Sequence, residues 1–317
     1  MAWSTVEKIA TTLLSGNIFA IVLTIIVAFG LPILLHFTLY RSAVAQSSTD
    51  FLLLGPSGSG KTALCSLLEQ RSRSNSDSAR QTHTSQDSSS VPVTLPSDVP
   101  TRSNRYRSVN DPSLADAKRH PARYFLLDTP GHGKLRDSQA ISKLQPTAAS
   151  TTGTKKAKAN SFRGVVFMID AAELAEDYNS LRDAAGYLHD TLLTLQRRVY
   201  RGGKRLPKKA PDTPVLVAAN KQDLFAALPA GSVRERLEAE IEKIRHSKRR
   251  GLLDASVNPM GGDEEEQEML GGDEIQAFTF AALQEETGVK VDVVGGAVKG
   301  DGADGVRRWE EWVGMCL

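Results

Sequence analysis

Blocks of apolar and polar residues alternate along the chain, and this pattern predicts strands that alternate with helices. Three runs, Phe51–Leu54, Gly164–Asp170 and Pro214–Ala219, are almost wholly apolar and have the length of strands buried on both faces. Tyr124–Asp128 has the same pattern, and Val289–Val294 alternates like a final strand. Each run therefore predicts one strand of a sheet.

Helices are predicted between these strands by apolar residues that recur every three or four positions. The longest such pattern runs from Tyr178 to Val199, and shorter ones run from Val233 to Ile244 and from Val306 to Val313. A further helix is expected after Thr62. Strands that alternate with helices indicate an α/β fold, with a mostly parallel sheet covered by helices on both faces.

The segment from Ile18 to Tyr40 is almost wholly apolar and contains no Asp, Glu, Lys or Arg. About 20 apolar residues cross a bilayer as a helix, so we expect a transmembrane helix over residues 18–40, in contact with the lipid bilayer. Residues 1–17 then form a short segment on one side, residues 41–49 a linker, and residues 50–317 the main domain. A cleaved signal peptide would have a shorter apolar region, and a buried core helix would have a polar stripe.

Three low-complexity stretches interrupt the main domain, at about residues 71–120, 145–160 and 252–272. The first is rich in Ser, Thr, Pro and Arg, and the last is acidic, so we expect insertions with little regular structure. Within the first stretch, Val91–Leu95 is a candidate edge strand, although prolines weaken that assignment.

Net charge and cysteine usage argue against a nucleic-acid-binding protein and against a disulfide-rich protein. A formal charge of +2 gives no general case for nucleic-acid binding, so we expect no direct, sequence-specific contact with nucleic acid. The cysteines, Cys65 and Cys316, do not make a disulfide framework, which suits a cytosolic domain.

The clearest motif follows the first strand, where residues 55–62 read Gly-Pro-Ser-Gly-Ser-Gly-Lys-Thr. Glycines let the backbone approach a dense negative charge, so that its N–H groups point at phosphates. The helix that starts near Lys61 adds the positive end of its dipole. Lys61 is expected to reach the β- and γ-phosphates of a nucleotide, and the Thr62 hydroxyl to ligate Mg²⁺. The predicted phosphate-binding residues are Gly55, Pro56, Ser57, Gly58, Ser59, Gly60, Lys61 and Thr62.

Two further motifs follow later strands, in the order that a guanine-nucleotide site needs. Asp128-Thr-Pro-Gly131 places a carboxylate that can hold Mg²⁺ through water and a Gly131 N–H that can meet a γ-phosphate. Asn220-Lys-Gln-Asp223 places a carboxylate that can accept two hydrogen bonds from guanine, a donor pair that adenine lacks. Asn220 can brace the loop and contact the base, and the Lys221 stem can cover its ring.

Together these motifs resemble the Ras-like small GTPases, which have a P-loop NTPase fold. The apolar N-terminal segment, Asp128-Thr-Pro-Gly-His132 and Asn220-Lys-Gln-Asp223 make the chain similar to the family of signal recognition particle receptor β subunits, in a form with expanded loops. The resemblance covers the anchor and the GTPase domain and excludes the three insertions.

This resemblance implies a location, a ligand and a partner. It implies a single-pass protein of the endoplasmic reticulum membrane that binds GTP or GDP with Mg²⁺. Residues 1–17 would be non-cytosolic and the GTPase domain cytosolic; the flanking charges, Lys8 and Arg41, do not settle this orientation. It also implies recruitment of the receptor α subunit in a GTP-dependent manner, and through it an indirect contact with the signal recognition particle, the ribosome and the translocon.

The chain departs from the Ras-like pattern at two places, and the position of its switch threonine leaves two candidates. Ala297-Val-Lys299 stands where these GTPases often have Ser-Ala-Lys, so a Ser hydroxyl contact is absent while a backbone N–H to the guanine O6 can survive. The switch threonine that binds Mg²⁺ is expected at Thr84, with Thr82 as the second choice. His132 stands where many small GTPases use a Gln to orient the attacking water. A neutral imidazole can position water, and a charged or misplaced one cannot.

GTP binding is therefore better supported than GTP hydrolysis, and three functions stay open. The first is a slow GTPase that a partner assists, with His132 as its candidate catalytic residue. The second is a GTP-loaded membrane scaffold with negligible turnover. The third is an anchored vesicle-traffic GTPase of the ADP-ribosylation-factor-like kind, although such proteins usually attach through a lipidated N-terminal Gly or an amphipathic helix, and Met1-Ala2-Trp3 lacks that start.

Overall fold

The computed structural model divides the chain into two compact units, Met1–Ser47 and Ser48–Leu317. It describes residues 26–32, 49–73, 85–102, 104, 121–145, 162–201, 204–205, 213–257, 270–271, 277–300 and 304–317. All statements on the fold concern these residues.

In the first unit, the described part is short. Ile26–Gly30 forms a π-helix, η1, and the side chains of Phe29 and Leu31 are exposed. Within the described ranges, no helix is both long and apolar enough to cross a membrane. Most of the transmembrane helix expected over residues 18–40 lies outside the described residues, so it stays a prediction.

The second unit is built on a six-stranded sheet with the order β2-β3-β1-β4-β7-β8. Strand β2 pairs antiparallel with β3, and every other pairing in this sheet is parallel. The mostly parallel sheet expected from the sequence is therefore confirmed. The strand bounds are β1 Asp50–Leu54, β2 Ser89–Thr94, β3 Arg123–Asp128, β4 Gly164–Asp170, β7 Val215–Asn220 and β8 Val291–Gly295. Strands β5, Tyr200–Arg201, and β6, Lys204–Arg205, form a separate two-stranded antiparallel ribbon.

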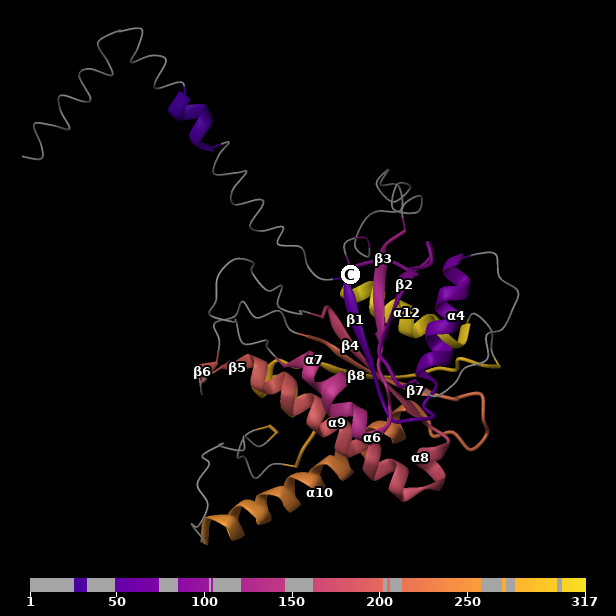
Figure 1. Ribbon diagram of the computed structural model, residues 1–317, viewed down its shortest axis with the longest axis vertical. Helices are drawn as coiled ribbons and strands as arrows, with labels where there is room; N and C mark the ends of the chain where they lie inside the picture. The colour runs from indigo at the N-terminus through magenta and orange to yellow at the C-terminus, as the bar shows by residue number, and fades with distance from the viewer. Residues whose placement is uncertain are drawn as a thin grey trace, which may run out of the picture. The chain divides into compact units, whose positions relative to one another are not determined.

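Helices cover both faces of the sheet (Figure 1). One face carries α4, Lys61–Arg73, and α12, Asp304–Cys316. The other carries α9, Tyr178–Val199, α10, Ala230–Val257, and α11, Phe280–Thr287. Shorter helical pieces are α6 Gly133–Arg136, η2 Asp137–Ile141, α7 Ser142–Leu144 and α8 Glu173–Glu176.

Burial on two faces explains why the central strands are apolar without interruption. In β1, Leu52 and Leu54 face the α9 side, while Phe51 and Leu53 face the α4 side, and all four side chains are fully buried. In β4, Phe167 packs edge-on against Tyr187 of α9, with 5.3 Å between the ring centroids. A strand that contacts helices on both faces has no position left for a polar side chain.

Two stretches that the sequence predicts as insertions contain regular structure. Strand β2 lies at the sheet edge within residues 71–120, where Pro92, which has no N–H to donate, is tolerated because an edge strand is bonded on one side only. Helix α10 runs to Val257, past residue 252 where a loop was expected, since no proline interrupts the chain before Pro259. Residues 146–161 lie outside the described ranges.

The parallel pairing brings four strand ends to one edge of the sheet. Leu54, Asp128, Asp170 and Asn220 each end their strand, and the registers place Leu53 beside Asp128 and Asp170 beside Asn220. Ligands of open α/β sheets bind in the crevice beyond these carboxyl ends. The fold therefore gathers the loops after β1, β3 and β7 in one place.

Two phenylalanines offer a matched test of this core. Phe167 is fully buried in β4, whereas Phe225 is fully exposed. We expect Phe167→Ala to lower the free energy of unfolding by about 3–5 kcal/mol, because it removes a large buried ring and leaves a cavity. Phe225→Ala should change it by less than about 0.5 kcal/mol. Urea unfolding of the detergent-solubilised chain without nucleotide measures both, and equal losses would contradict the assigned core.

Candidate functional site

The loop between β1 and α4 passes so close to its neighbours that two of its positions require glycine. A Cβ on Gly55 would lie 2.0 Å from the Met168 carbonyl oxygen, and a Cβ on Gly60 would lie 2.3 Å from Asn220 Nδ2. The φ angle is 140° at Gly55 and 98° at Gly60, and Gly58 between them also has a positive φ of 82°. The loop backbone is thus seated directly against β4 and the end of β7.

Lys61, the first residue of α4, points back into this loop. Its Nζ donates to the carbonyl oxygens of Gly55 at 2.8 Å and Pro56 at 2.7 Å. Burial lowers the pKa of Lys61 to about 8, while the Asp128 carboxylate acts in the opposite direction. An anion bound in the loop would favour the charged form of this ammonium, so the loop is suited to phosphate.

Oxygen atoms from three segments meet beside Thr62. The Thr62 hydroxyl donates to Asp128 Oδ2 at 2.9 Å and lies 3.0 Å from the Ser85 Oγ. The other carboxylate oxygen, Asp128 Oδ1, is buried and has no hydrogen-bond partner among the described residues. Burial raises the pKa of the Asp128 carboxyl, against the opposing effects of the Thr62 bond and the Lys61 charge.

This group of oxygens fits Mg²⁺. Magnesium takes oxygen ligands, commonly one or two carboxylates completed by water and substrate phosphates. Asp128 Oδ1, buried without a partner, and the Thr62 hydroxyl supply that kind of donor set. The described residues contain no group of three or more His, Cys, Asp or Glu that could hold a metal ion.

Ser85 was missed by sequence reasoning. Thr84 and Thr82, which were expected to bind Mg²⁺, lie outside the described residues, so their role stays a prediction. Ser85 is the next residue after Thr84, and its hydroxyl lies 3.0 Å from that of Thr62. In the sequence, Ser85 is marked only as a hydroxyl residue shortly before the edge strand. Several other residues of the Ser/Thr-rich stretch have the same property.

Gly131 lies against the phosphate loop. A Cβ on Gly131 would come within 2.7 Å of Lys61 Nζ and of the Ser57 backbone nitrogen. Two donor groups therefore converge on the space beside Gly131. The turn itself is held to β1, because the Thr129 hydroxyl donates to the Leu53 carbonyl oxygen at 2.7 Å.

Asn220 links the loops of the site. Its Nδ2 donates to the Ser59 carbonyl oxygen at 2.8 Å, and its Oδ1 accepts a bond from the Val298 N–H at 3.1 Å. One buried side chain therefore bonds the phosphate loop to the loop after β8. This is the bracing contact that the sequence led us to expect of Asn220.

The next three residues turn toward the loop after β8. Lys221 has a φ angle of 64°, and its ammonium forms an ion pair with Asp170. Asp223 is exposed and lies beside Gly300, where a Cβ would come within 3.0 Å of its carboxylate. Its carboxylate is thus available at the surface of the loop, as base recognition requires.

The loop after β8 lies near this turn, in an arrangement that the sequence did not specify. The Gly296 N–H donates to the Ala219 carbonyl oxygen at 2.9 Å, which fixes the loop to β7. Ala297 is buried and its N–H donates to Gly305, so this N–H is already bonded. Lys299 is exposed. The contacts of Ala297 and Lys299 with a base stay predictions.

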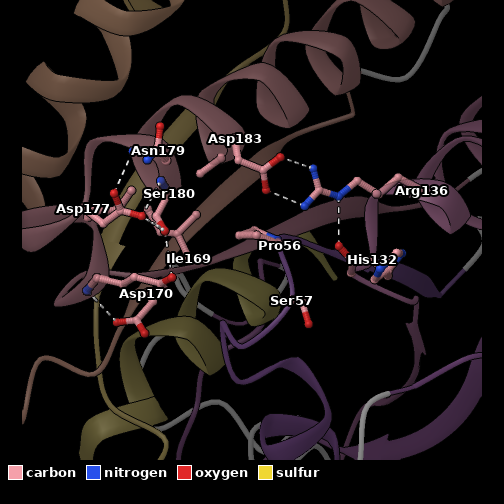
Figure 2. Close-up of a pocket in the computed structure, with 15 residues that line it drawn as sticks. Pro56, Ser57, His132, Arg136, Ile169, Asp170, Asp177, Asn179, Ser180 and Asp183 are labelled. Carbon is pink, nitrogen blue, oxygen red and sulfur yellow. Dashed lines mark hydrogen bonds and ion pairs between the residues drawn. The ribbon is translucent and has the colours of Figure 1, made fainter.

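His132 is exposed and lines an open pocket of about 400 Å³. Ser57 and Gly131 also line this pocket, so it adjoins the edge of the phosphate loop. In Figure 2, His132 lies toward one end of the pocket and Asp170 and Asp177 toward the other. His132 is the N-cap residue of α6, and its side chain makes no capping hydrogen bond.

The comparisons with known proteins point to one family. The model of the family described as "Signal recognition particle receptor beta subunit" matches residues 46–287. The signal recognition particle receptor subunit beta of Saccharomyces cerevisiae is 24% identical over 279 residues, which cover 86% of this chain and 87% of the yeast protein.

Solved structures of the same kind are also similar. The SRb-GTP/SRX complex from Chaetomium thermophilum matches with 32% identity and a TM-score of 0.60, over 84% of this chain and 98% of that chain. SRb-GDP-Mg from the same organism matches with 33% identity and a TM-score of 0.53, over 86% and 100%. The mammalian SRP receptor structure, at 20% identity, 84% and 100% coverage and a TM-score of 0.52, supports the fold.

A glycine pair tests the role of the turn after β3. We expect Gly131→Ala to weaken binding of a nucleoside triphosphate by on the order of tenfold relative to a diphosphate, because its Cβ would occupy space between Lys61 Nζ and the Ser57 nitrogen. Gly133→Ala is the control, since its Cβ would meet no atom within 4 Å. Isothermal titration with both nucleotides measures the effect. Equal triphosphate affinities in the two variants would contradict the assignment.

Proposed function

Because the chain belongs to the signal recognition particle receptor beta subunit family, we propose that it is the membrane-anchored, GTP-binding subunit of such a receptor. The observation that carries this proposal is the convergence of three loops at one sheet edge, where Asn220 bonds the phosphate loop to the loop after β8. The family match favours the receptor subunit over a vesicle-traffic GTPase.

The proposed ligands are GTP, GDP and Mg²⁺. Related chains from Chaetomium thermophilum are described as SRb bound to GTP, to GDP, and to GDP with Mg. In this chain, the N–H groups of Gly55 and of residues 57–60 and the Lys61 ammonium would bind the phosphates, and Thr62 and Asp128 would hold Mg²⁺ together with Ser85. When bound, Mg²⁺ would neutralise part of the charge on the phosphate oxygens.

Guanine would be selected by Asp223. Its exposed carboxylate accepts hydrogen bonds and donates none, which suits the N1–H and N2–H₂ edge of guanine. Asn220 would keep the base-binding loop in register with the phosphate loop, since it bonds to both segments. The positive φ of Lys221 turns the chain at this point, so that its aliphatic stem can lie along the base.

We propose that hydrolysis is slow in the isolated chain and needs a partner. His132 is exposed in an open pocket, so water around the imidazole is not excluded. Positioning of one attacking water is more effective in a closed site. A GTP-loaded scaffold with negligible turnover is the second candidate, and the same exposure of His132 favours it.

The proposed partner is the receptor α subunit, and the proposed location is the endoplasmic reticulum membrane. A related chain is described as a complex of SRb-GTP with SRX, which is a precedent for a GTP-bound form that holds a partner. Residues 18–40 would anchor the protein with its GTPase domain in the cytosol. Contact with the signal recognition particle, ribosome and translocon would follow indirectly through the α subunit.

Recovery of the α subunit tests this function. The detergent-solubilised chain would be loaded with a non-hydrolysable GTP analogue or with GDP and used to capture the α subunit from purified components. We expect capture with the GTP analogue and markedly less with GDP. Equal capture in both states would contradict a GTP-dependent recruiter. Single-turnover phosphate release with and without the α subunit then separates a partner-assisted GTPase from a scaffold.

Asp223→Asn tests base recognition. An Asn offers an N–H₂ donor where guanine also presents donors, so GTP affinity should fall by on the order of a hundredfold, since a hydrogen bond to a charged group contributes about 1.5–3 kcal/mol. Xanthosine triphosphate presents an oxygen in place of N2–H₂. It should therefore bind to Asp223→Asn more tightly than to the parent chain. Asp98→Asn, in a surface ion pair with Arg307, is the control. Unchanged GTP affinity in Asp223→Asn would refute the assignment.

A further inference from the structure

Arg136 connects the turn at Gly131 with helix α9. Its Nε donates to the Gly131 carbonyl oxygen at 2.9 Å. Its two terminal nitrogens donate to the two carboxylate oxygens of Asp183 at 2.7 and 2.6 Å (Figure 2). Each of the three guanidinium nitrogens thus makes one hydrogen bond, one to the Gly131 turn and two to α9.

The guanidinium is also held from the side by an aromatic ring. Arg136 lies 4.7 Å from the centroid of the Tyr187 ring, and its side chain is 13% exposed. Asp183 and Tyr187 are one turn apart on α9, so they present the carboxylate and the ring on the same face of the helix. Lysine cannot reproduce a bidentate bond and a planar stack together.

Tyr187 extends this connection toward the phosphate loop. The side chain is buried, and its ring packs on Phe167 in the core of the sheet. Burial raises the pKa of Tyr187 to about 12, and the Arg136 charge and the adjacent Thr129 and Gly55 groups act against that rise. The same tyrosine therefore lies next to Arg136, to the turn after β3 and to the start of the phosphate loop.

These contacts restrict how the Gly131 turn can move. Gly131 lies against Lys61 and Ser57, and its carbonyl group is bonded to a guanidinium that is itself fixed on α9. A displacement of the turn away from the phosphate loop has to break the Nε bond or displace Arg136 from Asp183 and Tyr187. The arrangement keeps Gly131 against Lys61 and Ser57, where the proposed function places a terminal phosphate.

We propose that Arg136 is a positioning residue that ties the Gly131 turn to Asp183 and Tyr187 of α9, and thereby sets the preference of the site for a nucleoside triphosphate over a diphosphate. This inference rests on the proposed function, because it concerns the same nucleotide site. Arg136 acts through Gly131 and does not itself touch the phosphates in this account. Helix α9 would also respond to the nucleotide state, because Arg136 bonds both to Gly131 and to Asp183 of α9.

The test compares two affinities in each variant. The dissociation constants of GDP and of a non-hydrolysable GTP analogue would be measured on the full detergent-solubilised chain, for the parent, Arg136→Lys and Asp183→Asn. We expect each variant to keep its GDP affinity and to lose preference for the triphosphate by about tenfold, within the usual range of coupling between sites. The double variant should lose little more than either single variant, because both remove the same connection.

Arg182→Lys is the matched control. Arg182 precedes Asp183 on α9 and is exposed, so its substitution should leave the ratio of the two affinities unchanged. GDP affinity reports on folding, because a variant that merely unfolds loses GDP and triphosphate alike. If Arg136→Lys fails to bind GDP, Asp183→Asn carries the test, since the Asp183 side chain is 53% exposed and tolerates an isosteric change.

The possible outcomes separate this inference from the function it rests on. A parent chain that binds neither guanine nucleotide would overturn both. The positioning role alone would be overturned if the parent chain binds both nucleotides and neither variant loses preference for the triphosphate. In that case the ratio of GDP to triphosphate dissociation constants in Arg136→Lys and Asp183→Asn would stay within twofold of the parent ratio or shift toward the triphosphate. A loss of triphosphate preference in both variants and not in Arg182→Lys would support it.

Discussion

The close approach of the Gly55–Gly60 backbone to β4 and β7 is the constraint on which the rest of the site depends. Side chains at Gly55 and Gly60 would collide with the Met168 carbonyl group and with Asn220. Because the loop is seated this deeply, Lys61 can bond to its carbonyl groups and Asn220 can bond to Ser59. A loop displaced outward would lose both contacts and separate phosphate binding from base binding.

The sheet supplies the other half of this arrangement. Parallel pairing of β1 with β3 and β4 brings Asp128 and Asp170 to the same edge as the phosphate loop. Asp128 meets Thr62 there, while Asp170 pairs with Lys221 and accepts bonds from the N–H groups of Ala172 and Glu173. Two buried carboxylates at equivalent strand ends thus make different contacts: Asp128 bonds to the Thr62 hydroxyl beside Ser85, and Asp170 fixes the chain.

Much of this fold was predictable from the sequence, because the central strands are buried on both faces and so consist of continuous apolar runs. The tight loop over residues 55–60 was predictable because its glycines are dictated by backbone geometry and contact distances. Ser85 and Arg136 were not, since a hydroxyl or a guanidinium gains its role from partners such as Thr62 and Asp183 that are distant in sequence. The extension of α10 to Val257 does not follow from the sequence pattern, because the low-complexity composition begins before the helix ends.

The central claim is that one guanine nucleotide spans the phosphate loop, the Gly131 turn and the Asn220–Asp223 turn. Competition between GTP and ATP for the purified chain in the presence of Mg²⁺ tests it most directly. The account predicts that GTP displaces a bound fluorescent guanine nucleotide at a concentration at least a hundredfold lower than ATP does, because a site built to accept the guanine donors leaves Asp223 unpaired with adenine. Equal displacement by ATP, or no binding of either nucleotide, would contradict it.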